Sequence, residues 1–369
     1  MPIENALFLT GAQRSGTTLL AKLLDAQPAV SMLSQPFPLL FVDAKRAFLQ
    51  SIGAGEEQYP LGHLFQELRY TGSELTAFLA SWRIAPESLA ELFARMDGYS
   101  GQYTKFTREQ ISGLETAGDF ATVVARLQRA LSPRSHARWY GSKETTCEEL
   151  VPYLLDRGFR CVIVVRDPRD MVASLNHGLG TEYAGSPKPT WFNVRSWRKS
   201  VAHVLALEGQ PRFHWCRYED VVADPARELT RLSSALELDL DVPPRLELQW
   251  SGNSSYGDRD GISAHSVRAY RDVLSGELAS AVEAACLPEL QLLGYETALT
   301  KDDALHALKT FAEPYEVTRA GMDRDRANAE NARVERERLE RIASPVGPHS
   351  SAWFLFERAH ARLREAFLA

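Results

Sequence analysis

The sequence predicts an α/β fold in which helices flank a parallel sheet, and two segments carry this prediction. The first, residues 6–9, is a short apolar run followed by a glycine-containing turn and then by leucines at helical spacing. The second, residues 161–165, is a run of five apolar residues, typical of a strand buried on both faces. Polar residues begin where each run ends, and ligands of open α/β sheets bind outside the carboxyl ends of the strands.

The first turn is a candidate anion site. Gly11 and Gly16 bound it and a predicted helix follows, so backbone N–H groups and the positive end of the helix dipole point toward one place. The phosphate-binding loop of nucleotide hydrolases has the same glycine spacing, but Thr17 stands here where that loop has its lysine. Arg14 is the only cation in the loop. We therefore expect a phosphorylated ligand that is not ATP used as a phosphoryl donor.

The second turn is a candidate site for another phosphate. Arg166 directly follows the predicted strand, and Ser174 lies about a turn and a half into the helix expected after it. Pro168 sits near the first helical turn, where its missing N–H costs little. A guanidinium and a hydroxyl are groups that bind a doubly charged phosphate well.

Both motifs resemble those of sulfotransferases that use 3′-phosphoadenosine-5′-phosphosulfate (PAPS), most of all the tyrosylprotein, carbohydrate and bacterial branches. The resemblance covers about residues 5–297 and implies a P-loop-type parallel sheet. It implies transfer of a sulfuryl group to a hydroxyl or amine, with adenosine 3′,5′-bisphosphate (PAP) as product. Arg166 and Ser174 would bind the 3′-phosphate. The 5′-phosphosulfate would be held by Arg14, Ser15, Gly16, Thr17 and Thr18.

The resemblance also gives Lys143 a catalytic role. Sulfuryl transfer expels a phosphate oxygen, so preorganised cations such as Lys143 and Arg14 should meet the growing negative charge, and no metal is required. The alternatives for Lys143 are a surface lysine or an ion-pair partner of Glu144 or Glu149.

Two further sites are implied by the resemblance. Ser255 matches by count a cofactor-binding serine in a loop that covers the adenosine in relatives. The lysine that precedes an aromatic residue in relatives falls on Ala269, so its charge would come from a neighbour, Arg268 or Arg271. Tyr218 and Glu219 belong to a strand-ending signature whose role we expect to be architectural.

The general base is open. Residues 30–41 resemble a wall of the acceptor site, and Gln35 falls where tyrosylprotein and many bacterial relatives have a basic glutamate. Glutamine does not take up a proton at neutral pH, although it can orient a hydroxyl. Three explanations compete: a base elsewhere, an acceptor that needs none, or an inactivating Glu→Gln substitution. The alternative bases are Glu144, His177 and Glu182.

The chain is expected to divide into a sulfotransferase domain, residues 1–299, and a helical extension, residues 300–369. An acceptor-side insertion at about 43–131 should hold helices at 43–52, 72–80, 86–96 and 118–131, and a further helix is expected at 190–207. The charge-rich stretch 319–341 suggests a solvated helix that pairs with a partner. Residues 352–368 should form a helix that packs on the enzyme or on a dimer mate.

Composition narrows the setting. A net charge of −6 without a basic stripe argues against general nucleic-acid binding. The four cysteines show no metal-binding spacing and suit a reduced compartment. No apolar run has the length of a membrane span, and the first strand begins too early for a signal peptide. We expect a cytoplasmic, bacterial enzyme acting on a small molecule, sugar or peptide.

Two other functions compete with this prediction. One is a sulfotransferase-like nucleotide-binding or scaffold protein, with Gln35 as the mark of weakened catalysis. The other is a P-loop small-molecule kinase, against which the missing loop lysine counts.

Overall fold

The computed structural model describes most of the chain, and the statements below concern these residues: 3–54, 70–96, 104, 106, 108–111, 114–178, 188–243, 248, 261–315, 324–347 and 349–368. The core is a five-stranded sheet in which every pair is parallel and the order is β2-β3-β1-β4-β5. The strands are β1 (Ala6–Thr10), β2 (Val30–Ser34), β3 (Trp139–Lys143), β4 (Arg160–Val165) and β5 (Phe213–Arg217).

The strand order places the predicted loop at the centre of one sheet edge. β1 lies in the middle, with Leu9 opposite Lys143 of β3 and Thr10 opposite Ile163 of β4. The chain builds β2 and β3 on one side of β1 and then crosses to build β4 and β5 on the other. Ligands of open parallel sheets bind at such a switch point, outside the carboxyl ends of the strands.

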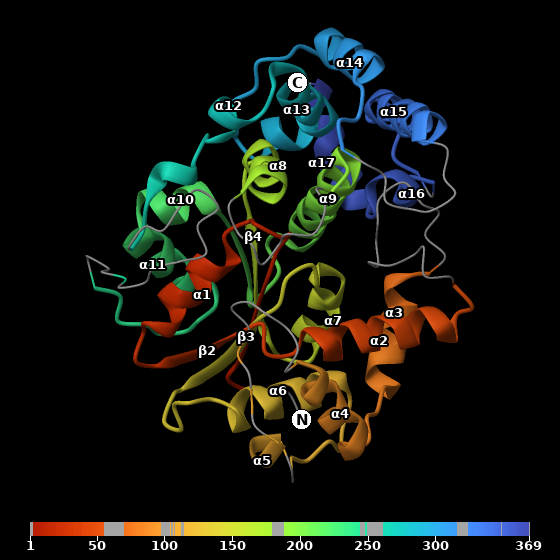
Figure 1. The fold of residues 1–369 in the computed structure, drawn as a ribbon. Coiled ribbons are helices and arrows are strands. Elements are labelled where there is room, and N and C mark those ends of the chain that lie inside the picture. The colour runs from red at the N-terminus through yellow and green to blue at the C-terminus, as the bar shows by residue number, and fades with distance from the viewer. Residues whose placement is uncertain are drawn as a thin grey trace.

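Helices cover both faces of the sheet (Figure 1). Alternate residues of β1 enter two different cores: Leu7 and Leu9 face one, and Ala6 and Phe8 face the other. The first face carries α1 (Thr17–Asp25), α10 (Tyr218–Ala223) and α11 (Pro225–Ala235). The second carries α6 (Phe120–Ala130), α7 (Val151–Asp156), α8 (Pro168–His177) and α9 (Thr190–Leu207).

The helices predicted for the acceptor-side insertion are present, and the helix expected at 190–207 has the same bounds in α9. The aromatic side chains of the insertion pack as helix contacts: Phe48 meets Phe78 with ring centroids 5.4 Å apart, and Trp82 meets Phe120 at 5.2 Å. Besides α6, these helices are α2 (Pro38–Ser51), α3 (Gly72–Ser81), α4 (Pro86–Arg95) and the short α5 (Arg108–Ile111).

The carboxyl-terminal helices gather around one long helix, α13 (Gly276–Leu292), at the end of the molecule opposite α4 and α6 (Figure 1). Between α11 and α13 the described residues form two short elements, η5 (Ala264–Ser266) and α12 (Tyr270–Val273). The helices of the extension are α14 (Lys301–Thr310), α15 (Arg324–Arg341), α16 (Ser351–Phe354) and α17 (Glu357–Leu368). The one helix expected at 352–368 is two, because Leu355 adopts a left-handed conformation (φ 63°) that interrupts it. α17 packs on α13 and α9 of the same chain.

The prediction of a solvated helix at 319–341 is wrong for one face of α15. Glu335 is fully buried and pairs with Arg195 and Arg198 of α9, and Arg338 pairs with Glu289 of α13. Leu339 is buried beside them. The charges that suggested exposure are thus used in buried ion pairs. In the described part of the chain, no helix is both long and apolar enough to cross a membrane.

Candidate functional site

The loop between β1 and α1 is shaped by steric contacts at its two glycines. Gly16 caps α1 in a left-handed conformation (φ 94°), and a Cβ there would collide with the ring of Tyr218. A Cβ at Gly11 would collide with the carbonyl oxygen of Val164 in β4. The spacing noticed in the sequence therefore lets the loop lie against β4 and α10 at the amino end of α1.

The same loop contains a buried donor that suits an anion. Ser15 is fully buried, and its Oγ has no hydrogen-bond partner among the described residues. A buried hydroxyl without a partner is uncommon and costs free energy. Thr17 is also buried, in the first turn of α1, where N–H groups lack partners within the helix. These features fit a phosphate-type group at the loop.

The structure brings the two predicted phosphate motifs together. Arg14 Nε donates to Ser174 Oγ at 2.8 Å, although the two residues are 160 positions apart. Arg166 Nη1 donates to the backbone oxygen of Arg14 at 3.0 Å, and its Nη2 donates to that of Ser266 at 2.5 Å. Arg166 Nε is buried without a hydrogen-bond partner among the described residues, so this guanidinium keeps a donor for a ligand.

Two aromatic residues frame Arg166. Its Cζ lies 4.7 Å from the ring centroid of Tyr218, and Trp197 Nε1 donates to its backbone oxygen at 2.7 Å. Glu219 Oε1 accepts from the N–H of Asp167 at 2.9 Å, which agrees with the architectural role predicted for this signature. Tyr218 does more than predicted, because it contacts both the glycine loop and Arg166. The sequence feature that could have marked Tyr218 as a site residue is its position directly after β5, the strand that pairs with β4.

Lys143, at the carboxyl end of β3, is held by Gln35. Its side chain is 1% exposed, which excludes a surface lysine, and Nζ donates to Gln35 Oε1 at 2.7 Å. Gln35 in turn donates its backbone N–H to the Lys143 oxygen at 2.8 Å, and its Nε2 lies 3.5 Å from Thr145 Oγ1. Gln35 has a φ of 44°, a conformation that costs a residue other than glycine some free energy.

Positive charge converges at this end of β3. Burial lowers the pKa of Lys143 to about 8; the neighbouring Glu144 opposes this, and the charges of Arg14 and Lys22 add to it. Lys22 was not among the predicted site residues. It lies one helical turn after Thr18 on α1, a spacing that could have marked it from the sequence.

The alternative bases lie in different places. Glu144 is buried and accepts from the N–H of Phe37 at 2.8 Å, and burial raises its pKa to about 8. His177 is exposed at the end of α8, with Nε2 2.6 Å from the hydroxyl of Tyr315. Glu182 lies outside the described residues, as does the predicted cofactor contact Ser255.

A buried charge cluster supports the backbone just after Lys143. Lys45 Nζ donates to the oxygen of Thr146 at 2.6 Å, and Lys199 Nζ donates to Glu149 at 2.8 Å. Lys45 also pairs with Glu149. Glu149 is therefore the partner of these two lysines rather than of Lys143. Glu148, in the 3₁₀ turn η3 (Glu148–Leu150), completes the cluster at 3.0 Å from Lys199.

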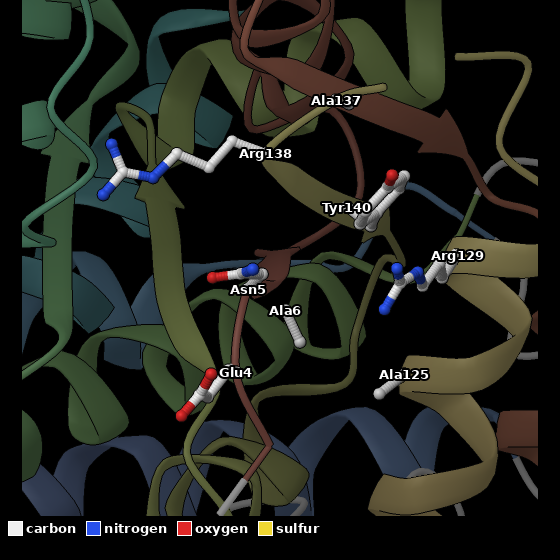
Figure 2. A pocket seen from close by; sticks show the side chains of 8 residues that line it. All are labelled: Glu4, Asn5, Ala6, Ala125, Arg129, Ala137, Arg138 and Tyr140. Atoms are coloured by element: carbon white, nitrogen blue, oxygen red, sulfur yellow. The ribbon is translucent and has the colours of Figure 1, made fainter. Parts of the chain in front are cut away.

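A small cavity of about 120 Å³ lies at the opposite, amino end of β1 and β3 (Figure 2). Arg129 reaches toward the ring of Tyr140, with Cζ 5.8 Å from the ring centroid, while Arg138 points away from it. None of the predicted site residues lines this cavity. The candidate site is therefore at the other edge of the sheet.

The sheet order, the glycine loop that opens α1 and the turn after β4 define an α/β protein of the P-loop type without the loop lysine. The sulfotransferase family model matches residues 6–242, and the chain belongs to the sulfotransferase family. It is an enzyme that transfers a sulfuryl group, and its donor is PAPS. The predicted fold class, reaction and donor are thereby confirmed.

Several solved structures are similar at low identity. The sulfotransferase domain of the Synechococcus PCC 7002 olefin synthase is 18% identical, with 81% of this chain and 98% of that chain covered and a TM-score of 0.44. The sulfotransferase domain from the curacin biosynthetic pathway is also 18% identical, with 81% of this chain and 100% of that chain covered and a TM-score of 0.45. Retinol dehydratase in complex with retinol and PAP is 16% identical, with 81% of this chain and 85% of that chain covered and a TM-score of 0.38. No curated protein matches the chain.

Proposed function

We propose that the loop Arg14–Thr18 holds the 5′-phosphosulfate of PAPS, and that Arg166 and Ser174 hold its 3′-phosphate. The hydrogen bond between Arg14 and Ser174 carries this proposal, because it joins the two motifs at one place. The buried Ser15 hydroxyl and Arg166 Nε are donors that would gain partners from phosphate oxygens.

The cations near β3 would serve the chemical step. Bound PAPS supplies an activated sulfuryl group, whose transfer leaves negative charge on a phosphate oxygen. Lys143, which is buried, and Arg14, which is half-buried, present fixed positive charge, and such preorganised charge stabilises a transition state effectively. Gln35 orients the Lys143 ammonium through its 2.7 Å hydrogen bond, so we assign it a positioning role and not that of a base.

The acceptor would enter on the side of the helical insertion. Gln35 directly follows the edge strand β2 there, and the N–H of Thr104 lies 2.8 Å from the oxygen of Ser34, the last residue of that strand. The rings of Phe37 and Phe93 pack edge to face at 6.0 Å behind it. The acceptor we propose is a small molecule, sugar or peptide with a hydroxyl or amine. Because all four cysteines are buried and free, we place the enzyme in a reducing compartment, the cytoplasm. The resemblance of its two motifs to the bacterial branch of the family supports a bacterial source.

The proposal is tested by calorimetric binding of PAP, with ADP as the comparison. We expect wild-type protein to prefer PAP by at least ~10-fold, roughly 1.4 kcal/mol. Arg166→Ala should weaken PAP binding by about 2–3 kcal/mol, because a charge-assisted contact is lost. Arg227→Ala, an exposed arginine of α11, is the control and should leave PAP binding unchanged. Unchanged affinity in Arg166→Ala would remove Arg166 from the site.

Gln35→Glu tests the role of Gln35. A carboxylate at this position would pair with the ammonium of Lys143, so we expect kcat for release of PAP from PAPS to fall by about 10-fold. The measurement uses a panel of hydroxyl and amine acceptors. A rise in kcat would contradict the positioning role and would mean that the natural chain carries an inactivating substitution.

A further inference from the structure

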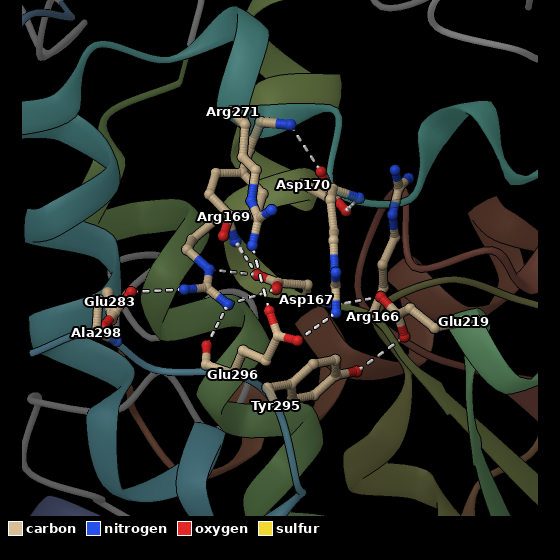
Figure 3. Close-up of polar contacts among 12 residues, drawn as sticks. Arg166, Asp167, Arg169, Asp170, Glu219, Arg271, Glu283, Tyr295, Glu296 and Ala298 are labelled. Atoms are coloured by element: carbon tan, nitrogen blue, oxygen red, sulfur yellow. Dashed lines mark hydrogen bonds and ion pairs between the residues drawn. The ribbon is translucent and has the colours of Figure 1, made fainter.

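The turn between β4 and α8 sends its charged side chains to three different parts of the molecule (Figure 3). Arg166 faces the glycine loop, as described above. Arg169 is buried and pairs with Asp167 at 2.7 Å and with Glu283 of α13 at 2.5 Å, which ties the turn to the carboxyl-terminal helices. Asp170 is fully buried and turns toward the segment 266–270. The sequence alone indicated no role for Asp170.

Asp170 uses both carboxylate oxygens on the backbone of that segment. Oδ2 accepts from the N–H of Arg268 at 2.6 Å, and Oδ1 accepts from the N–H of Tyr270 at 2.8 Å. Arg268 has a φ of 62°, a left-handed conformation that a side chain other than glycine resists. The two hydrogen bonds therefore hold the segment in a conformation that its own sequence does not favour.

The beginning of the same segment orients Arg166. The backbone oxygen of Ser266 accepts from Arg166 Nη2 at 2.5 Å, and its hydroxyl lies 2.7 Å from the hydroxyl of Tyr218. The Tyr218 ring in turn lies against the Arg166 guanidinium. Ser266, together with the Arg14 oxygen and the Tyr218 ring, thus fixes where Arg166 points, and Asp170 binds the backbone only two residues further on.

The two arginines from which the resemblance expects charge here, Arg268 within the segment and Arg271 directly after it, are paired with one carboxylate. Arg268 Nη2 lies 2.6 Å from Glu296 Oε1, and Arg271 Nη2 lies 3.2 Å from Glu296 Oε2. Both guanidiniums are thus drawn to one exposed carboxylate. What the segment offers to Arg166 is a backbone oxygen.

We propose that Asp170 is a positioning residue of the 3′-phosphate site: it holds the segment 266–270 so that the Ser266 oxygen aims Arg166 at the phosphate. This inference rests on the proposed assignment of Arg166 to the 3′-phosphate. A carboxylate is required because two N–H donors converge on it. An amide of the same shape would turn an NH₂ group toward one of these N–H groups.

The test compares Asp170→Asn with wild type for two ligands, PAP and adenosine 5′-monophosphate (AMP), which lacks the 3′-phosphate. We expect Asp170→Asn to weaken PAP binding by at least ~10-fold and AMP binding by less than ~2-fold. A general structural defect would weaken both ligands alike, and thermal denaturation of each variant reports it separately. Glu296→Gln removes the surface partner of the same segment and should leave both affinities unchanged.

A double-mutant cycle identifies the residue through which Asp170 acts. In the Arg166→Ala background, Asp170→Asn should have no further effect on PAP binding, because the contact it controls is already lost. Equal weakening of PAP in both backgrounds, or equal weakening of PAP and AMP, would overturn the proposal. If Asp170→Asn does not fold, Tyr218→Phe takes its place, because it removes the partner of the Ser266 hydroxyl. This variant should weaken PAP binding about 3-fold and leave AMP binding unchanged. An unchanged preference for PAP over AMP would overturn the proposal.

The same measurements distinguish the role of Asp170 from the assignment of Arg166 to the 3′-phosphate site. Wild-type protein that binds AMP as tightly as PAP, or Arg166→Ala that keeps full PAP affinity, would overturn the 3′-phosphate site itself. A normal preference for PAP that is lost in Arg166→Ala but kept in Asp170→Asn would overturn only the role of Asp170.

Discussion

Replacement of Lys143 by methionine is expected to lower kcat for PAPS turnover by ~10²–10³-fold, with a much smaller change in the KM for PAPS. Methionine keeps the apolar stem that fills this buried position and removes only the charge. The ammonium is held by Gln35 before any ligand arrives, so it needs no reorganisation when negative charge develops. Loss of such a preorganised group acts on the transition state more than on binding.

The pH profile distinguishes a cationic Lys143 from a basic one. Burial lowers its pKa to about 8, so its positive charge is lost as the pH rises through that value. Wild-type activity should therefore fall above about pH 8, and Lys143→Met should lack this limb. A base at this position would instead give activity that rises with pH. Lys309→Met, an exposed lysine of α14, is the control. A kcat for Lys143→Met within twofold of wild type would exclude the role.

Glu335→Ala is expected to lower the free energy of unfolding by about 3–5 kcal/mol, although Glu335 belongs to a helix far along the chain from the glycine loop. Its carboxylate is fully buried and lies 2.6 Å from Arg198 Nη2 and 2.9 Å from Arg195 Nη2 of α9. Alanine would leave two arginines of the same buried helix without their partner. An uncompensated buried charge is among the most destabilising changes that a single substitution makes.

Urea denaturation followed by circular dichroism measures this effect. Glu340→Ala is the matched control, because Glu340 lies on the exposed face of the same helix. Its substitution should change the free energy of unfolding by no more than about 0.5 kcal/mol. Equal values for the two variants would mean that α15 does not dock on α9 in solution.

The amino-acid sequence alone determined the parts of this protein that depend on neighbouring residues. The apolar runs that become β1 and β4, the glycine loop, the helices of the insertion and the full extent of α9 were predictable, because each follows from local spacing. The family and its donor follow from two motifs of the same kind. β2 gave no comparable signal, since Ser31 and Ser34 interrupt a short run that serves as an edge strand.

Only the tertiary structure decided which polar groups meet. Arg14 contacts Ser174 across 160 positions, and Asp170 contacts Tyr270 across 100, because the order of the strands brings the ends of β1, β4 and β5 to one edge. The same holds for Gln35, which sequence comparison treats as a missing base and the fold makes the partner of Lys143. The local sequence does not show which distant residue a charged side chain pairs with. For this reason α15 was predicted to be solvated, although one of its faces is buried. Long-range pairing of polar groups is a property of the packed chain.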